Sequence, residues 1–138
     1  MCPFTIHNID HIVLRVNDMQ RSLDFYVGLL GCSIAKTNEH YSMVHLRTGT
    51  SMIDIIDVKG ILGKAGGDAP DSHRPNVDHL CLRIEPFNLT ELRAYFASHQ
   101  IDVGEPMVRY GAEGEGLSIY INDPDGNRVE LKGPSEKV

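Results

Sequence analysis

The sequence predicts an α+β protein built from two repeated β-α-β-β-β modules, and three observations favour this fold class. The first is an internal repeat, because Ile-Asp-His-Ile-Val-Leu-Arg-Val at residues 9–16 returns as Val-Asp-His-Leu-Cys-Leu-Arg-Ile at residues 77–84. The second is a helical apolar pattern after each copy, and the third is an alternating, acid-bearing segment that ends each half. Such a recurrence indicates a duplicated supersecondary unit.

The first module is expected at about residues 7–58, and its first strand alternates as a half-buried strand should. Asp18 can cap the helix that follows, and Gly31 is a plausible stop. The apolar stripe of this helix is Met19, Leu23, Tyr26, Val27 and Leu30. Three further strands are predicted, with a turn at 48–50, at roughly 32–37, 42–47 and 51–58.

The second module is expected at about residues 77–133. Asn88 and Glu91 have the spacing of a capping box, and the predicted helix runs to His99 or Gln100. Its apolar stripe is Leu89, Leu92, Tyr95 and Phe96. Three strands are predicted at roughly 102–103, 117–122 and 128–132, and Asp-Pro-Asp-Gly at 123–126 predicts a hairpin turn.

Glycine and proline gather between the two modules, within residues 57–76. This composition predicts a linker or lid at about residues 59–76. A second stretch, 104–116, is rich in Gly and Glu and is predicted to be an irregular loop.

The bulk composition is that of one globular domain spanning residues 1–138. Hydrophobic residues make up 41% and charged residues 23% of the chain, which disfavours disorder. The net charge of −6 gives no broad electrostatic footprint for nucleic acid. No apolar run approaches the roughly 20 residues of a membrane span, so neither nucleic acid nor membrane is expected as a partner.

The cysteines and the N-terminus favour a cytoplasmic location. Cys2, Cys32 and Cys81 are widely spaced and form no Cys-x-x-Cys pair, so neither a disulfide framework nor a thiolate zinc site is indicated. Cys32 and Cys81 are expected to be small buried side chains. The first residues lack the charged and apolar regions of a signal peptide.

Two histidines and two carboxylates recur at equivalent positions. His11 and His79 lie opposite the aliphatic face of their strands, and Asp54 and Glu130 lie opposite the aliphatic face of the last strand of each module. Imidazole and carboxylate form a normal ligand set for a divalent metal ion. A competing interpretation makes Asp10-His11 and Asp78-His79 polar pairs at a packing interface. The other histidines, which lack a repeat partner, are expected to be structural or at the surface: His7, His40, His45, His73 and His99.

Arg15 and Arg83 share the faces of His11 and His79. A guanidinium group suits a substrate carboxylate, so both arginines are candidate substrate-binding residues. The alternative is a salt bridge to Asp54, Glu130 or an acid in a loop.

Four segments together resemble the vicinal-oxygen-chelate superfamily, which contains glyoxalases, bleomycin-resistance proteins and extradiol dioxygenases. They are residues 9–16, Met-Gln-Arg-Ser-Leu-Asp-Phe-Tyr-Val-Gly-Leu-Leu-Gly at 19–31, Val-Asp-His-Leu at 77–80, and Asp-Pro-Asp-Gly-Asn-Arg-Val-Glu-Leu at 123–131. The resemblance implies that the two modules form sheets curled around a metal cleft, in a homodimer. It also implies one divalent ion (Zn, Ni, Co, Mn or Fe(II)) with the ligands His11, Asp54, His79 and Glu130.

The resemblance also implies an activity, that of a metal-dependent lyase or isomerase acting on a small carbonyl compound. Glu130 or Asp54 would be its general base. A glutathione hemithioacetal is one candidate substrate, although glyoxalase I usually has Glu or Gln where this chain has the shorter Asp54. The alternatives are an Fe(II) extradiol-type dioxygenase and a non-catalytic ligand-binding or resistance protein. Fosfomycin resistance is disfavoured, because Val13 stands where those enzymes commonly have Thr.

Overall fold

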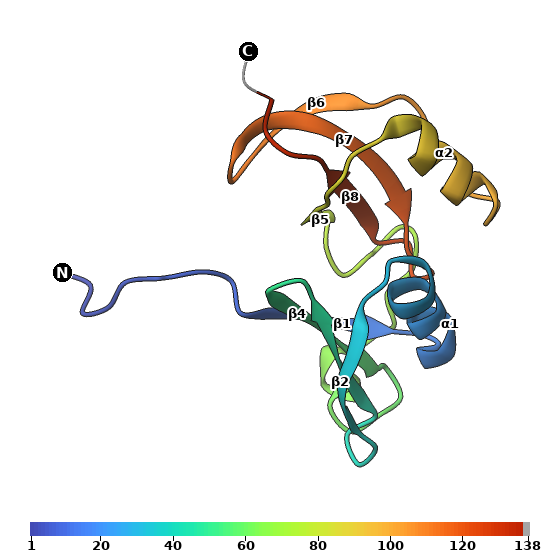
Figure 1. Ribbon diagram of the computed structural model, residues 1–138. Helices are drawn as coiled ribbons and strands as arrows, with labels where there is room; N and C mark the ends of the chain where they lie inside the picture. Colours follow the sequence, from blue (N-terminus) through green and yellow to red (C-terminus); the bar gives the residue numbers. More distant parts are fainter. Residues whose placement is uncertain (137–138) are drawn as a thin grey trace. The chain divides into compact units, whose positions relative to one another are not determined.

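The computed structural model describes residues 1–136, in two compact units. Module one is Met1–Asn76 and module two begins at Val77. Each unit holds one four-stranded sheet and few helices, which confirms the predicted two-module α+β fold (Figure 1). None of the helices in the part of the chain that the structure describes is long and apolar enough to cross a membrane.

Module one follows the predicted β-α-β-β-β order. Its elements are β1 (His11–Val16), α1 (Met19–Leu23), the π-helix η1 (Asp24–Leu29), β2 (Ser33–Asn38), β3 (Met43–Thr48), β4 (Ser51–Asp57) and the short 3₁₀ helix η2 (Gly63–Gly66). The sheet order is β1-β4-β3-β2, with β1 parallel to β4 and the other pairs antiparallel. The first and last strands of the module are therefore neighbours.

Module two repeats this topology. Its elements are β5 (His79–Arg83), α2 (Leu89–Ala97), β6 (Met107–Gly111), β7 (Gly114–Asn122) and β8 (Arg128–Lys132). The sheet order is β5-β8-β7-β6, with β5 parallel to β8 and the other pairs antiparallel. The repeat seen in the sequence is thus a repeat of structure.

Strand alternation sorts the side chains as predicted. In β1, Leu14 and Val16 are buried whereas His11 and Val13 are exposed, because successive side chains point to opposite faces. The buried aliphatic side chains of the sheets are Leu14, Val16, Val44, Leu46, Ile53, Ile55 and Ile56 in module one, and Ile119, Ile121, Val129 and Leu131 in module two. Burial of these faces provides most of the hydrophobic stabilisation of each module.

The helix of module one differs from the prediction after its first turn. Asp18 caps it as expected, since its side chain accepts a hydrogen bond from the Arg21 backbone N–H. The chain then widens into η1, where the Leu30 N–H bonds to the Phe25 carbonyl five residues back. The wider turn rotates the buried face, so Tyr26 of the predicted stripe is buried as expected, but the other buried side chains are Ser22, Phe25 and Leu29. Gly31 ends the segment at φ 81°.

The capped helix of module two ends earlier than predicted. The Asn88 side chain accepts a hydrogen bond from the Glu91 backbone N–H, which confirms the cap. The helix stops at Ala97 with Ser98 as its C-cap, and Gln100 follows with φ 59°.

The predicted strand at 102–103 is wrong. The strand lies at β6, inside the stretch 104–116 that was predicted to be irregular, and β7 also begins in that stretch. The glycines hid the strand pattern, because they form a tight hairpin in which Gly111 pairs with Gly114 at φ 105°. A third glycine, Gly116, lies within β7 and pairs in register with Arg109 of β6.

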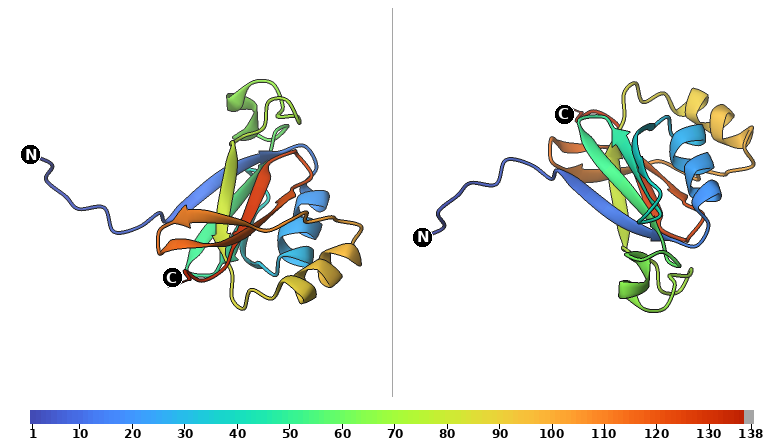
Figure 2. Two further views of the ribbon diagram at one scale, coloured as in Figure 1. Left: turned by 90° about the horizontal axis from the view of Figure 1, so that it is seen from above. Right: turned by 90° about the horizontal axis from the view of Figure 1, so that it is seen from below.

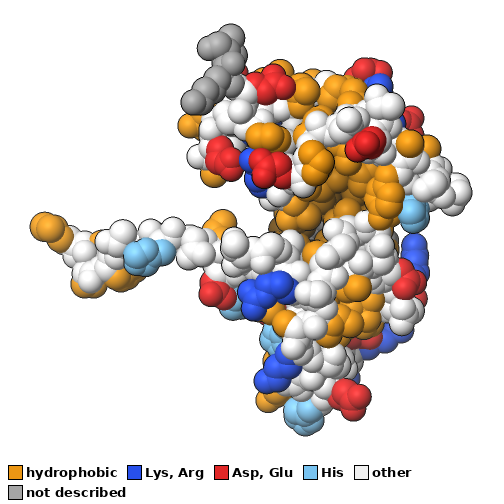
Figure 3. All heavy atoms as spheres, viewed as in Figure 1, with side chains coloured by type: hydrophobic (Ala, Val, Ile, Leu, Met, Phe, Trp, Pro, Cys, Tyr) orange, Lys and Arg blue, Asp and Glu red, His pale blue; other side chains and the backbone are white. Residues whose placement is uncertain are grey.

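Two segments of module one lie outside its sheet. The chain between β4 and residue 76, green to yellow-green in Figure 2, projects from the sheet and carries η2 and an isolated bridge between Asp71 and Arg74. The N-terminal segment, residues 1–10, has no strand or helix, and hydrophobic side chains lie exposed along it (Figure 3). Phe4, Ile6 and Ile9 are exposed there. The segment therefore adds nothing to the core of module one.

Candidate functional site

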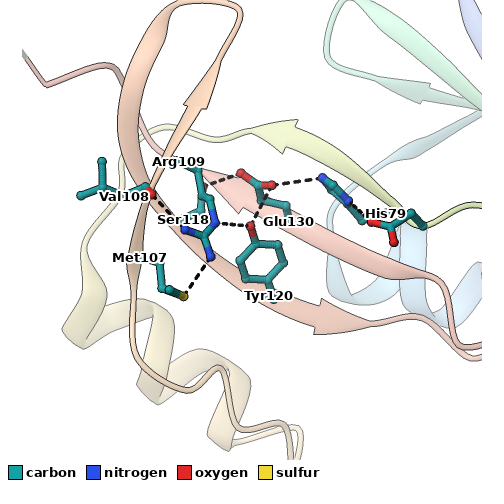
Figure 4. A network of polar contacts seen from close by, with 8 residues as sticks. His79, Met107, Val108, Arg109, Ser118, Tyr120 and Glu130 are labelled. Atoms are coloured by element: carbon teal, nitrogen blue, oxygen red, sulfur yellow. Dashed lines mark hydrogen bonds and ion pairs between the residues drawn. The ribbon is translucent and has the colours of Figure 1, made fainter.

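Glu130 is held in place by three neighbouring strands of module two. It lies in the centre of β8, paired with Cys81 of β5 on one side and Tyr120 of β7 on the other. Ser118 donates a hydrogen bond of 2.6 Å to one carboxylate oxygen, and the Tyr120 hydroxyl donates one of 3.1 Å to the other. Figure 4 shows these side chains converging on the carboxylate. The carboxylate, on a residue only 5% exposed, is therefore fixed in one orientation.

The same neighbours set the protonation state of Glu130. Burial favours its neutral form, but the hydrogen bonds from Ser118, Tyr120 and Cys81 outweigh that effect and lower the pKa of Glu130. Burial and the nearby Glu130 raise the pKa of Cys81 to about 11, so its thiol remains protonated and can donate to the carboxylate. At neutral pH the group is a carboxylate, which is the form that binds metal ions.

Two of the cysteine expectations have different outcomes. Cys32 is buried, as predicted, whereas Cys81 is exposed. The reason is strand alternation, which places Cys81 on the same face of β5 as His79 and Arg83 rather than on the aliphatic face.

His79 lies beside Glu130, with a carboxylate near each of its ring nitrogens. Its Nδ1 is 2.6 Å from a carboxylate oxygen of Asp78, and its Nε2 is 3.4 Å from Oε1 of Glu130. The hydrogen bond from His79 lowers the pKa of Asp78. Carboxylates in this position orient metal-binding histidines and leave the other nitrogen for the ion.

Module one contains a related pair, His11 and Asp54. Nδ1 of His11 is 2.6 Å from Asp10, and this hydrogen bond, with the charge of Asp54, raises the pKa of His11 despite some desolvation. Asp54 is 3% exposed, and its Oδ2 lies 3.1 Å from Nδ1 of His45. Its other oxygen, Oδ1, is buried without a hydrogen-bond partner in the described part of the chain. An orphaned buried carboxylate oxygen is suited to receive a cation.

His45 and Tyr120 occupy corresponding places in the two sheets. His45 of β3 pairs in register with Asp54, and Tyr120 of β7 pairs in register with Glu130. The sequence analysis expected His45 to be structural or at the surface, and it missed Ser118 and Tyr120. Because loops of the two modules differ in length, the spacing that relates His11 to His79 does not relate His45 to Tyr120. Alternation along β7 would have placed Ser118 and Tyr120 on one face.

A pocket of about 250 Å³ opens beside Glu130 within module two. Its lining comprises His79, Cys81, Arg83, Tyr110, Gly111, Ala112, Glu113, Glu130 and Lys132. Arg83 was predicted to bind substrate or form a salt bridge, and its guanidinium pairs with Glu85 at 3.1 Å and Glu113 at 3.2 Å. Its charge is thus balanced, while its role toward a substrate stays a prediction.

Arg15 holds the segment that follows β4. Its guanidinium donates to the backbone carbonyls of Gly63 (3.1 Å), Gly67 (2.6 Å) and Asp68 (3.0 Å). The Asn76 side chain bonds to both the backbone N–H and the carbonyl of Arg15, as a neighbouring strand would. These contacts fasten both ends of the loop to β1.

Replacing Arg15 with Met is expected to loosen this loop. Three hydrogen bonds worth about 0.5–1.5 kcal/mol each would be lost, so amide exchange at Lys64, Ala65 and Gly67 should accelerate roughly tenfold or more. Hydrogen–deuterium exchange measures this, with Arg47→Met, an exposed arginine of β3, as the matched control. Unchanged exchange together with a raised KM would instead assign Arg15 to substrate binding.

The predicted ligands fit a divalent ion in their chemistry, with one His–carboxylate pair in each module. Across residues 1–136, however, no group of three or more His, Cys, Asp or Glu side chains is gathered as a ready metal site. The four-residue ligand set His11, Asp54, His79 and Glu130 therefore stays a prediction.

The fold and these residues define a two-module α+β protein with a His–carboxylate pair in each sheet. The sequence model of the Glyoxalase/Bleomycin resistance protein/Dioxygenase superfamily matches residues 8–131. The chain belongs to this superfamily, as the sequence analysis expected.

Individual relatives cover most of the chain. The virulence protein STM3117 of Salmonella typhimurium is 33% identical over 91% of this chain and 83% of its own length. Its crystal structure matches with a TM-score of 0.74 over 96% of this chain and all of that one, at 28% identity. The glyoxalase domain-containing protein RDO1 of Mycosarcoma maydis is 31% identical over 92% of this chain and 68% of its own length. A lactoylglutathione lyase of Escherichia coli O157:H7 is 27% identical over 88% of both chains.

Proposed function

We propose that this protein is a metal-dependent lyase or isomerase of the glyoxalase type that acts on a small carbonyl compound. The observation that carries the proposal is the arrangement around Glu130, a buried carboxylate fixed by Ser118 and Tyr120 and lying 3.4 Å from His79 in an open pocket. The resemblance to a lactoylglutathione lyase makes a glutathione hemithioacetal the first substrate to test.

The metal ligands in this proposal are His11, Asp54, His79 and Glu130, of which each module supplies two. A divalent ion bound there would polarise a carbonyl oxygen and so acidify the adjacent C–H bond. Asp10 and Asp78 orient the two histidines through their Nδ1 atoms. Zn, Ni, Co, Mn and Fe(II) all suit this set of ligands.

Proton transfer is assigned to the carboxylates. Glu130, or Asp54 through its unpaired Oδ1, would remove a proton from the carbon next to the carbonyl and return it to the neighbouring carbon. The Ser118 and Tyr120 hydroxyls keep the Glu130 carboxylate oriented during that transfer. A homodimer and a cytoplasmic location, both expected from the sequence analysis, are part of the same proposal.

Removing the metal is expected to abolish activity. Purified protein should contain close to one divalent ion per chain by elemental analysis, lose turnover after treatment with a chelator, and regain it with one of the five ions. The activity screen should contain the methylglyoxal–glutathione hemithioacetal, acyl-CoA epimers and catechols, with metal content measured in parallel. Absence of bound metal after reconstitution would exclude the proposal.

The same screen separates the alternatives. Consumption of oxygen with a catechol in the presence of Fe(II) would assign the dioxygenase activity. Saturable ligand binding without any product would assign a binding or resistance protein.

A further inference from the structure

Lys132 is a buried cation that the proposed mechanism does not use. It is the last residue of β8, it is 4% exposed, and it lines the pocket next to Glu130. Among the described residues, no hydrogen bond or ion pair engages its ammonium group. Arg83, the other cation of the pocket, already pairs with Glu85 and Glu113. Of the two cations that line the pocket, Lys132 is therefore the one without an ion-pair partner among the described residues.

Two glycines make room for this side chain. A Cβ added at Gly116 would lie 2.9 Å from Nζ of Lys132 and 2.7 Å from the carbonyl oxygen of Pro134. A Cβ added at Gly111 would lie 3.1 Å from Cε of Lys132. The hairpin of β6 and β7 is thus shaped around an extended lysine, and any larger residue at Gly116 would displace the ammonium group.

The position of Lys132 relates it to the candidate ligands. It lies two residues beyond Glu130 on the same face of β8, so their Cα atoms are about 7 Å apart. Because the residue is only 4% exposed, water screens its ammonium group poorly, and an anion that enters the pocket would give that group a direct partner. The charge-assisted hydrogen bonds formed then are stronger than neutral ones.

We propose that Lys132 binds an anionic group of the substrate, a carboxylate or a phosphate-type group, in the pocket of module two. The reactive oxygens of that substrate would lie toward Glu130 and His79, and its anionic group about 7 Å further along the strand. This inference rests on the proposed function for the reaction, since it names the substrate class of the same site: an anionic carbonyl compound.

Anion binding to the full-length protein tests this inference. Titration calorimetry with acetate and, separately, with methylphosphonate is expected to show saturable binding, and the tighter probe identifies the anionic group. Lys132→Met should weaken that binding by about tenfold to a hundredfold, while Lys132→Arg should retain most of it. Lys36→Met, an exposed lysine of β2, is the matched control and should change nothing.

Metal content, measured on the same samples, keeps the two proposals apart. Suppose that the protein contains metal. If it then binds neither probe, or if its anion binding does not depend on Lys132, this inference is overturned and the proposed function stands. Lys132-dependent binding by protein that takes up no metal supports the inference and removes the proposed metal chemistry.

A second measurement covers the case in which Lys132→Met fails to fold. Reductive methylation of the unaltered protein, read by mass spectrometry, should modify Lys132 more slowly when the bound probe is present, while exposed Lys36 reacts at an unchanged rate. An unchanged rate at Lys132 would overturn the inference.

Discussion

Replacing Glu130 with Gln is expected to lower turnover by at least about 10²-fold and up to 10⁴-fold. The substitution keeps the size of the side chain but removes its charge, which the proposed metal ion and the proton transfer both require. It also places an N–H₂ group opposite the Ser118 or Tyr120 hydroxyl, where the carboxylate accepts hydrogen bonds of 2.6 Å and 3.1 Å. Bound metal should therefore fall together with turnover, as elemental analysis and steady-state kinetics on a confirmed substrate will show.

Two further variants interpret this result. Glu115→Gln changes an exposed glutamate on the adjacent strand β7 and should leave metal and turnover unchanged. Asp54→Asn separates the possible roles, because loss of turnover with metal retained would identify Asp54 as the base. Full turnover in both Glu130→Gln and Asp54→Asn would contradict proton abstraction by these carboxylates.

The features that the sequence predicted depend on local patterns. Alternation along β1 and β8 placed Leu14 and Val129 in the cores and His11 and Glu130 on the opposite faces, and the structure agrees. Helix starts were predicted correctly because a cap such as Asp18 acts within one turn. The repeat then fixed the topology, since two copies of one unit share one strand order.

The features that were missed depend on contacts between distant segments. The π-helix η1 (Asp24–Leu29) has no local sequence signal, and it changes which side chains of the helix are buried. The strand β6 was hidden among glycines whose role is to approach β7 and Lys132 closely. Likewise, the Asp54–His45 contact appears only when β3 and β4 pair in register.

Replacing Asp123 with Ala is expected to destabilise module two by about 3 kcal/mol or more. Asp123 lies in the turn between β7 and β8, and its carboxylate accepts hydrogen bonds of 2.9 Å from the backbone N–H groups of Asp125 and Asn127 and from the Asn127 side chain. Asn127 is fully buried, so water cannot replace the lost acceptor. Urea denaturation followed by circular dichroism should show a lower midpoint.

The effect should be large because small domains are stable by only about 5–15 kcal/mol, and because the turn joins the strands that carry Tyr120 and Glu130. Asp102→Ala is the matched control, since Asp102 also accepts a backbone N–H, from Gly104 at 2.8 Å, but at an exposed position. Asp102→Ala should lower the free energy of unfolding by no more than about 1 kcal/mol. The stability of Asp123→Asn should fall between those of the two alanine variants. The new amide oxygen at position 123 still accepts the backbone N–H groups, and the Asn127 amide can rotate so that its own oxygen faces the new N–H₂ group. If Asp123→Ala and Asp102→Ala were equally stable, the buried hydrogen bonds of Asp123 would contribute no more to stability than the exposed hydrogen bond of Asp102.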